Sequence, residues 1–151
     1  MVFGETNRMY DHIKEEIIKH EGKINKVYKD HLGNATFGVG HLVLPTDNLE
    51  EGVEYNDTTI MEYFERDFDQ ALHDARSFIQ EESIDPVGFG CVINMAFQLG
   101  LPRLSKFKKF KEALDKQDYV SASTEMLDSR WAKQTPNRAN ELAETMRGIN
   151  V

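Results

Sequence analysis

The stretch EGKINKVYKDHLGNATFGVGH, from Glu21 to His41, decides the fold of this chain. Before it, apolar residues recur at three- and four-residue spacing, which predicts a helix capped by Thr6 or Asn7 and ending near Glu21. Gly22 follows, and glycine is a common residue just beyond a helix end. Glu21 is therefore expected at a helix C-terminus, beside apolar neighbours.

The rest of the stretch predicts a β-hairpin. From Ile24 the pattern alternates with a period of two up to Asp30, a turn follows over residues 31–34, and residues 35–40 form a returning strand. Thr36, Gly38 and Gly40 would share one face of that strand. Glycines inside a strand indicate close approach of a ligand or another backbone, or else a bulge or a sharp bend.

Two carboxyl groups of this stretch lie in different surroundings. Glu21 is expected at the negative end of a helix dipole among apolar side chains, which favours its protonated form, or else it is a solvated surface residue. Asp30 stands in a polar turn beside Lys29 and is expected to stay charged. Such a pair suits hydrolysis of a glycosidic bond, with Glu21 as acid, Asp30 as base or stabiliser, and Thr36 holding a water.

The middle of the chain predicts a long helix and a buried one. Asp57 or Thr58 caps the long helix, which reaches about Gln80. Asp67 lies on its apolar stripe and needs a partner, for which His41 is a candidate. After Asp85-Pro86, residues 87–99 form an apolar helix ended by Gly100, the centre of a helical lobe. On that helix Asn94 and Gln98 are one turn apart and form a polar strip.

The C-terminal third predicts short helices over residues 118–127 and 129–133, and a last helix that begins at Pro136 with Thr135 as its cap and Arg138 in its first turn. Ahead of them, basic and aromatic residues alternate at helical spacing. This segment is a solvated face over packed aromatics or, as the alternative, a contact with an anionic wall or membrane. Its cations are Arg103, Lys106, Lys108, Lys109 and Lys111.

Composition bounds the possible functions. The chain has 151 residues, 40% hydrophobic residues and a formal net charge of -8, which fits one globular domain and disfavours nucleic acid as a partner. Its single cysteine, Cys91, cannot form an internal disulfide. We expect no signal peptide, no membrane-spanning segment, no metal and no cofactor. Asp47 to Thr58 fails as a calcium loop because position twelve lacks a carboxylate.

The order of short motifs resembles the phage-type lysozymes of the T-even lineage. The resemblance rests on Glu21-Gly22, on the run from Tyr28 to His41, on residues 93–100, on Ser129-Arg130-Trp131 and on residues 134–139. It implies a mostly helical α+β fold with two lobes in one domain. The sheet-bearing lobe spans about 12–57, the connecting helix 58–80, and the helical lobe 81–151 together with the N-terminal helix, with a cleft between the lobes.

The resemblance also implies an activity and the residues that perform it. It implies an inverting muramidase that cuts the β-1,4 bond between N-acetylmuramic acid and N-acetylglucosamine in bacterial peptidoglycan. Glu21, Asp30 and Thr36 match the catalytic positions, and Arg138 matches an arginine that pairs with the catalytic glutamate. His41 and Asp67 match a structural ion pair. Cleft-lining positions are matched by Leu42, Phe97 and Gln98.

The acidic charge departs from the basic free enzymes of that lineage. It suggests a tail-associated lysozyme whose wall contact is supplied by a larger phage particle; otherwise the chain is a monomer. The protein is expected to be made in the host cytoplasm and to act on the cell wall, in host lysis or wall penetration. The alternatives are a catalytically silent wall-binding module of the same fold and a glycosidase acting on chitin-type polymers.

Overall fold

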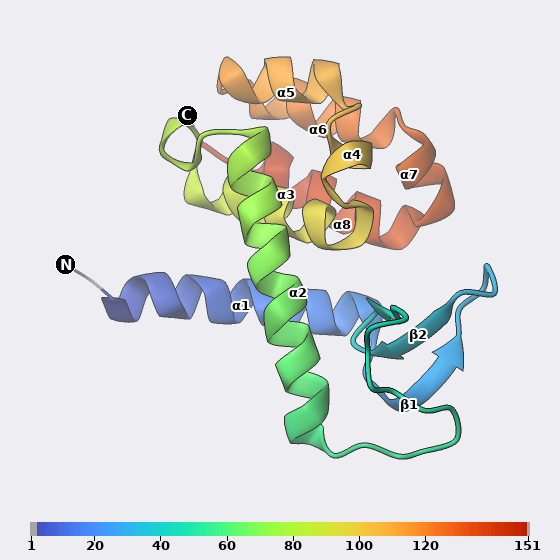
Figure 1. Cartoon of the computed structure of the whole chain (residues 1–151). Helices are drawn as coiled ribbons and strands as arrows, with labels where there is room; N and C mark the ends of the chain where they lie inside the picture. The colour runs from blue at the N-terminus through green and yellow to red at the C-terminus, as the bar shows by residue number, and fades with distance from the viewer. Residues whose placement is uncertain (1–2, 151) are drawn as a thin grey trace. The chain divides into compact units, whose positions relative to one another are not determined.

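The computed structural model describes the backbone of residues 3–150 and the side chains of residues 10–150. This part of the chain contains eight α-helices, one short 3-10 helix and a three-stranded antiparallel sheet. Figure 1 shows the course of the chain. The mostly helical α+β class predicted from the sequence is confirmed. The chain divides into two compact units, residues 1–70 and 71–151, and the division falls within helix α2 (Asp57–Phe78).

The first unit begins with helix α1 (Phe3–Glu21). The helix already begins at Phe3, so the predicted start at Thr6 or Asn7 is wrong. A capping residue favours a helix start but does not force one, and no proline stands before these residues to interrupt the helix. The predicted end at Glu21 is confirmed: Gly22 has a φ of +78° and its N–H donates to the Ile18 carbonyl at 2.7 Å. This left-handed glycine turns the chain toward the sheet.

The sheet runs in the order β1 (Ile24–Lys29), β2 (Ala35–Gly38), β3 (His41–Leu42). The hairpin of β1 and β2 is as predicted, with an irregularity in β1 between its paired residues 24 and 27. The prediction that the second strand continues to Gly40 is wrong. Gly38 and Gly40 have φ values of +62° and +63°, so the chain reverses there into the short third strand. Of the alternatives for these glycines, the sharp bend is the one observed.

Helix α2 begins one residue from its predicted start. Its first turn is capped by Asn56, whose side-chain oxygen accepts the backbone N–H of Thr59 at 2.9 Å, so neither Asp57 nor Thr58 is the cap.

In the first unit the Phe37 ring of β2 is fully buried and meets Tyr55 and Tyr63 edge-on. The other buried side chains of this unit are Ile13, Ile17, Thr36, Val39, Ile60, Phe64 and Phe68.

The second unit is a cluster of helices around α3 (Pro86–Leu99), as Figure 1 shows. Every residue from Gly88 to Ala96 is buried, so the prediction of a helix buried almost all round is confirmed. Asp85 caps this helix by accepting the Val87 N–H at 2.8 Å. The other elements are the 3-10 turn Glu81–Ser83 and helices α4 (Leu101–Leu104), α5 (Lys108–Asp115), α6 (Tyr119–Leu127), α7 (Arg130–Gln134) and α8 (Pro136–Arg147).

Two local predictions in this unit need correction. The basic and aromatic segment forms two short helices, α4 and α5, separated by a turn at residues 105–107, because Gly100 (φ +76°) and Pro102 restart the helix at Leu101. Thr135 stands just before α8 but its side chain does not cap it. Its hydroxyl instead donates to the Trp131 carbonyl at 3.1 Å, a contact that depends on the neighbouring helix α7.

Candidate active site

Asp30 closes the turn of the hairpin through hydrogen bonds from the backbone. Its Oδ1 accepts the N–H groups of Leu32 and Asn34, both at 2.9 Å, and the Asn34 side chain donates to Oδ2 at 3.4 Å. The Asn34 N–H is the main reason that the pKa of Asp30 lies below its ordinary value, and it outweighs the partial loss of solvent. Asp30 is thus held as a charged acceptor, and Oδ2 retains capacity for another donor.

Thr36 supplies a buried hydroxyl beside this turn. The residue lies on β2 opposite Tyr28 of β1 and is 6% exposed. Its Oγ1 donates to the Asn34 carbonyl at 2.9 Å. Because its proton is used in this bond, the hydroxyl oxygen acts as an acceptor toward any further group.

Glu21 lies against the second turn of the sheet. A Cβ atom built on Gly40 would stand 2.6 Å from Glu21 Oε1 and 2.9 Å from its Cδ, a separation that real side chains do not tolerate. Gly40 is favoured by its positive φ, and a side chain at this position would displace the Glu21 carboxyl group. The glutamate that ends α1 and the turn between β2 and β3 are packed together.

Tyr28 is a residue of this site that the sequence analysis missed. Its phenol has a pKa raised above the ordinary value, first by partial burial and then by the negative charges of Glu21 and Asp30. Both carboxyl groups therefore lie within electrostatic range of one phenol. The available signal was the spacing: Tyr28 and Asp30 are two residues apart, a spacing that predicts the same side of an extended chain.

His41 links β3 to two acids. Its Nδ1 lies 2.7 Å from Asp67 Oδ2 on α2, so the pair expected from the apolar stripe is present. Its Nε2 lies 2.8 Å from Asp47 Oδ2, a contact that the sequence analysis missed. Burial lowers the pKa of His41, but the two carboxylates outweigh it and raise the pKa above its ordinary value. Asp47 also accepts the Leu44 N–H at 2.8 Å, which helps to lower its own pKa against the effect of desolvation.

In the second unit Arg138 and Asn94 form a buried pair. Arg138 is 7% exposed and Asn94 is 2% exposed. Arg138 Nε donates to Asn94 Oδ1 at 2.9 Å, which joins α8 to the middle of α3. A buried guanidinium requires such acceptors, since its desolvation is otherwise costly.

Gln98, near the end of α3, joins two more helices. Its Oε1 accepts the indole N–H of Trp131 at 2.8 Å, and its Nε2 donates to the Thr135 hydroxyl at 3.3 Å. Trp131 is 2% exposed, so the bond satisfies a buried donor. Phe97, the preceding residue, is half-buried.

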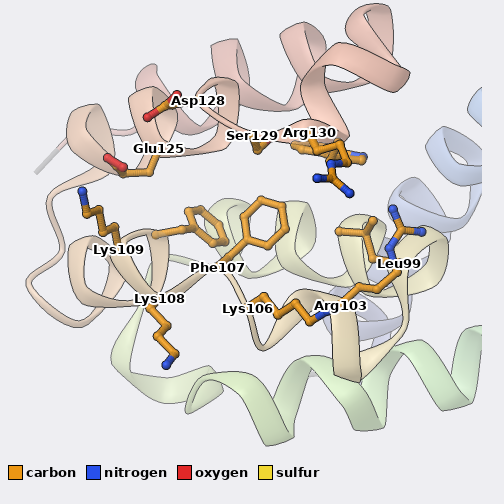
Figure 2. A pocket seen from close by; sticks show the side chains of 12 residues that line it. Leu99, Arg103, Lys106, Phe107, Lys108, Lys109, Glu125, Asp128, Ser129 and Arg130 are labelled. Carbon is orange, nitrogen blue, oxygen red and sulfur yellow. The ribbon is translucent and has the colours of Figure 1, made fainter.

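A pocket of about 640 Å³ lies among α3, α4, α5, α6 and α7 within the second unit. Figure 2 shows its lining, which combines aromatic side chains with five cations from residues 103–109 and 130. Within the part of the chain that the structure describes, none of the predicted site residues contributes to this lining. The pocket is thus a feature separate from the hairpin.

The family model described as phage lysozyme matches residues 18–147. The chain belongs to the phage lysozyme family. The resemblance noted in the motifs is therefore confirmed over most of the sequence.

Relatives within this family occur in a eukaryote and in phages. A protein named "Probable T4-type lysozyme 2" from Dictyostelium discoideum is 26% identical over 89% of this chain and 92% of its own length. "Peptidoglycan hydrolase gp36" of Pseudomonas phage phiKMV is 25% identical over 88% of this chain but only 15% of its own length. "Pre-baseplate central spike protein Gp5" of Enterobacteria phage T4 is 26% identical over 85% of this chain and 26% of its own length.

In this member of the phage lysozyme family, the predicted site residues occur in both units. The first unit holds Glu21, Asp30, Thr36, His41, Leu42 and Asp67, and the second holds Asn94, Phe97, Gln98 and Arg138. Leu42 lies on β3 opposite Thr36 and is 56% exposed. An exposed apolar side chain next to the hairpin hydroxyl is available for contact with a ligand.

Neither a membrane-crossing helix nor a metal-binding cluster occurs among the described residues. None of their helices combines the length and the apolar character that crossing a bilayer requires. No three of their histidine, cysteine, aspartate or glutamate side chains are grouped as a metal site.

Proposed function

We propose that this chain is a muramidase that hydrolyses the β-1,4 bond between N-acetylmuramic acid and N-acetylglucosamine. Membership of the phage lysozyme family supports a hydrolase of this type, as does a relative named as a peptidoglycan hydrolase. The observation that carries the proposal is that the Glu21 carboxyl lies against the turn between β2 and β3, in the same small sheet whose hairpin holds Asp30 and Thr36. Both carboxyl groups also raise the pKa of the Tyr28 phenol, which agrees with the pair of acids that glycoside hydrolysis requires.

In the proposed reaction Glu21 donates its proton to the leaving oxygen while a water attacks the anomeric carbon. The Thr36 oxygen accepts one hydrogen of that water, because its own proton is donated to the Asn34 carbonyl. Asp30 Oδ2 accepts the other hydrogen and takes the proton as the new bond forms. Attack on the face opposite the leaving group inverts the anomeric centre. For such a reaction we expect the carboxyl groups of Glu21 and Asp30 to be roughly 6.5–9.5 Å apart, which leaves room for the water.

The remaining site residues have proposed supporting roles. Arg138 would pair with Glu21, with Asn94 orienting the guanidinium through the bond at 2.9 Å. Leu42, Phe97 and Gln98 would contact the glycan. His41 and Asp67, now joined by Asp47, would hold β3 and its loop against α2.

The substitution Glu21→Gln tests the mechanism. It should lower the release of reducing ends from purified sacculi by roughly 10²-fold or more, since the amide cannot donate the proton. The control is Glu15→Gln, an exposed carboxylate on the same helix, which should retain native turnover. Muramic acid at the new reducing ends, with inverted anomeric configuration by NMR, is the expected product. Native turnover by Glu21→Gln would contradict the mechanism.

The same assay separates the alternatives. A silent wall-binding module would sediment with sacculi and release no sugar, and a chitin-type glycosidase would prefer N-acetylglucosamine oligomers. A role in host lysis or in wall penetration, alone or in a tail particle, is proposed from the names of the phage relatives.

A further inference from the structure

The pocket of the second unit has the size and the floor of a small-ligand site. Its volume of about 640 Å³ falls within the range of roughly 300–1,000 Å³ that is common for such sites. Leu99 and Trp131 form buried parts of its lining, at 7% and 2% exposure. The half-buried ring of Phe107 lies at its centre in Figure 2, with Phe110 and Trp131 edge-on at 6.2 and 6.3 Å. The pocket thus offers a flat apolar surface held in place by its neighbours.

The charge of the pocket opposes that of the chain. The chain carries a formal net charge of -8, whereas the lining has five cations and only two acids, Glu125 and Asp128. In Figure 2 Glu125 lies at the end next to Lys109, while Arg103, Lys106 and Arg130 surround the opposite end. Among the described residues, these last three side chains take part in no salt bridge.

The start of α5 adds a local conflict within the same pocket lining. Lys108 and Lys109 occupy its first turn, there is no acid in that turn, and its N-cap residue Phe107 has no side chain that can accept a hydrogen bond. Cations at the positive end of a helix dipole are unfavourable, whereas an anion there is favourable. A natural sequence that breaks a local rule in this way usually does so at a functional site.

We propose that this pocket binds a phosphorylated sugar, with the phosphate between Arg103, Lys106 and Arg130 and the sugar ring on Phe107. A phosphate carries up to two charges and three acceptor oxygens, which match two guanidinium forks and an ammonium. A lipid fits less well, because the apolar side chains of the floor are recessed and cannot enter a bilayer. Phosphorylated envelope glycans would then hold an acidic hydrolase at its substrate, a consequence that rests on the proposed function.

Trp131 is the only tryptophan of the chain, so its fluorescence reports on the pocket. Titration of the full chain with glucose 1-phosphate should change this fluorescence to saturation, and calorimetry gives a second readout of the same Kd. Glucose should give neither signal. The double substitution Arg103→Gln with Arg130→Gln should raise Kd about tenfold or more, since charge-assisted hydrogen bonds are lost. Both residues are exposed, so the fold should be retained, and thermal unfolding checks this.

Lys116→Gln is the matched control, because Lys116 is exposed, belongs to the same unit and lies outside the pocket. It should bind as the native chain does. Equal signals with glucose, an equal loss in Lys116→Gln, or no heat and no fluorescence change up to the solubility of glucose 1-phosphate would overturn the proposal. So would a response to phosphatidylglycerol vesicles alone. The Glu21→Gln chain should bind normally, so failure of the hydrolase mechanism leaves this result intact.

Discussion

Asp30 is charged because the backbone of its own turn donates to it. The asparagine substitution keeps the shape but loses the charge and the ability to take a proton, so Asp30→Asn should lower kcat by roughly 10²-fold. The residue is half-buried and the asparagine oxygen can still accept the N–H groups of the turn, so we expect little change in stability. Because its pKa lies below the ordinary 3.8, the native carboxylate should remain charged at pH 4. Any acid limb of native activity above that pH must then arise from another group, which rate measurements across pH would show.

His41 lies between two carboxylates, and its titration should appear in stability. Its folded pKa is above the ordinary 6.5, so its stabilisation is complete below that value and is lost as pH rises through the folded pKa. The contribution of Asp47 to stability depends on pH in the opposite sense. Its pKa is lowered below the ordinary 3.8, so its stabilisation is lost as pH falls through that lowered pKa. His41→Asn should therefore lower the free energy of unfolding by about 3 kcal/mol near pH 5.5, and by less near pH 9.

Urea unfolding at the two pH values measures this difference. His73→Asn is the control, because His73 is an exposed histidine on α2, and it should unfold like the native chain at both. An unchanged deficit for His41→Asn at the higher pH would mean that the imidazole acts by packing alone, without its charge.

At the scale of elements, the turn between β2 and β3 positions the glutamate at the end of α1. Gly40→Ala places a methyl group where Glu21 Oε1 now lies and strains a backbone at φ +63°. We expect a loss of about 1–3 kcal/mol in stability and a fall in kcat of roughly tenfold or more, because the carboxyl group must move.

Gly52→Ala separates the two effects. Gly52 has a φ of +80°, but an added Cβ meets no atom within 4 Å. It should lose a similar amount of stability and retain native kcat. Equal activity of the two variants, compared by urea unfolding and by turnover on sacculi, would argue against a role for the turn in placing Glu21.

At the scale of the whole molecule, the net charge of -8 opposes contact with an anionic wall. Added salt screens this repulsion, since the Debye length falls to about 8 Å at physiological ionic strength. The rate of hydrolysis of purified sacculi should therefore rise as salt is added from low ionic strength. A short uncharged oligosaccharide is the control substrate and should show no such gain. A steady fall in the rate on sacculi would contradict this account and the idea of a missing basic partner.

Sequence signals predicted element boundaries best where a residue type, such as glycine or proline, has one characteristic role in the backbone. Gly22 after the apolar stripe of α1, Asp85-Pro86 before α3 and the turn residues after Asp30 all placed boundaries that the structure contains. Asp67 on an apolar stripe also predicted its partner, because a half-buried charge needs one. The start of α1, the third strand and the cap of α8 were missed, since each depends on contacts that no short window contains.

The sequence by itself determined the class of fold, the family and the hairpin that carries Asp30 and Thr36, because these follow from periodicity, turn chemistry and motif order. Tertiary structure alone decided that Tyr28 lies within electrostatic range of two carboxyl groups, that Asp47 is the second partner of His41, and that Gln98 accepts the indole N–H of Trp131. It also gathered cations from three helices around one pocket. The reason is that spacing along a chain specifies which face a side chain occupies, whereas the groups that meet it come from residues distant in sequence.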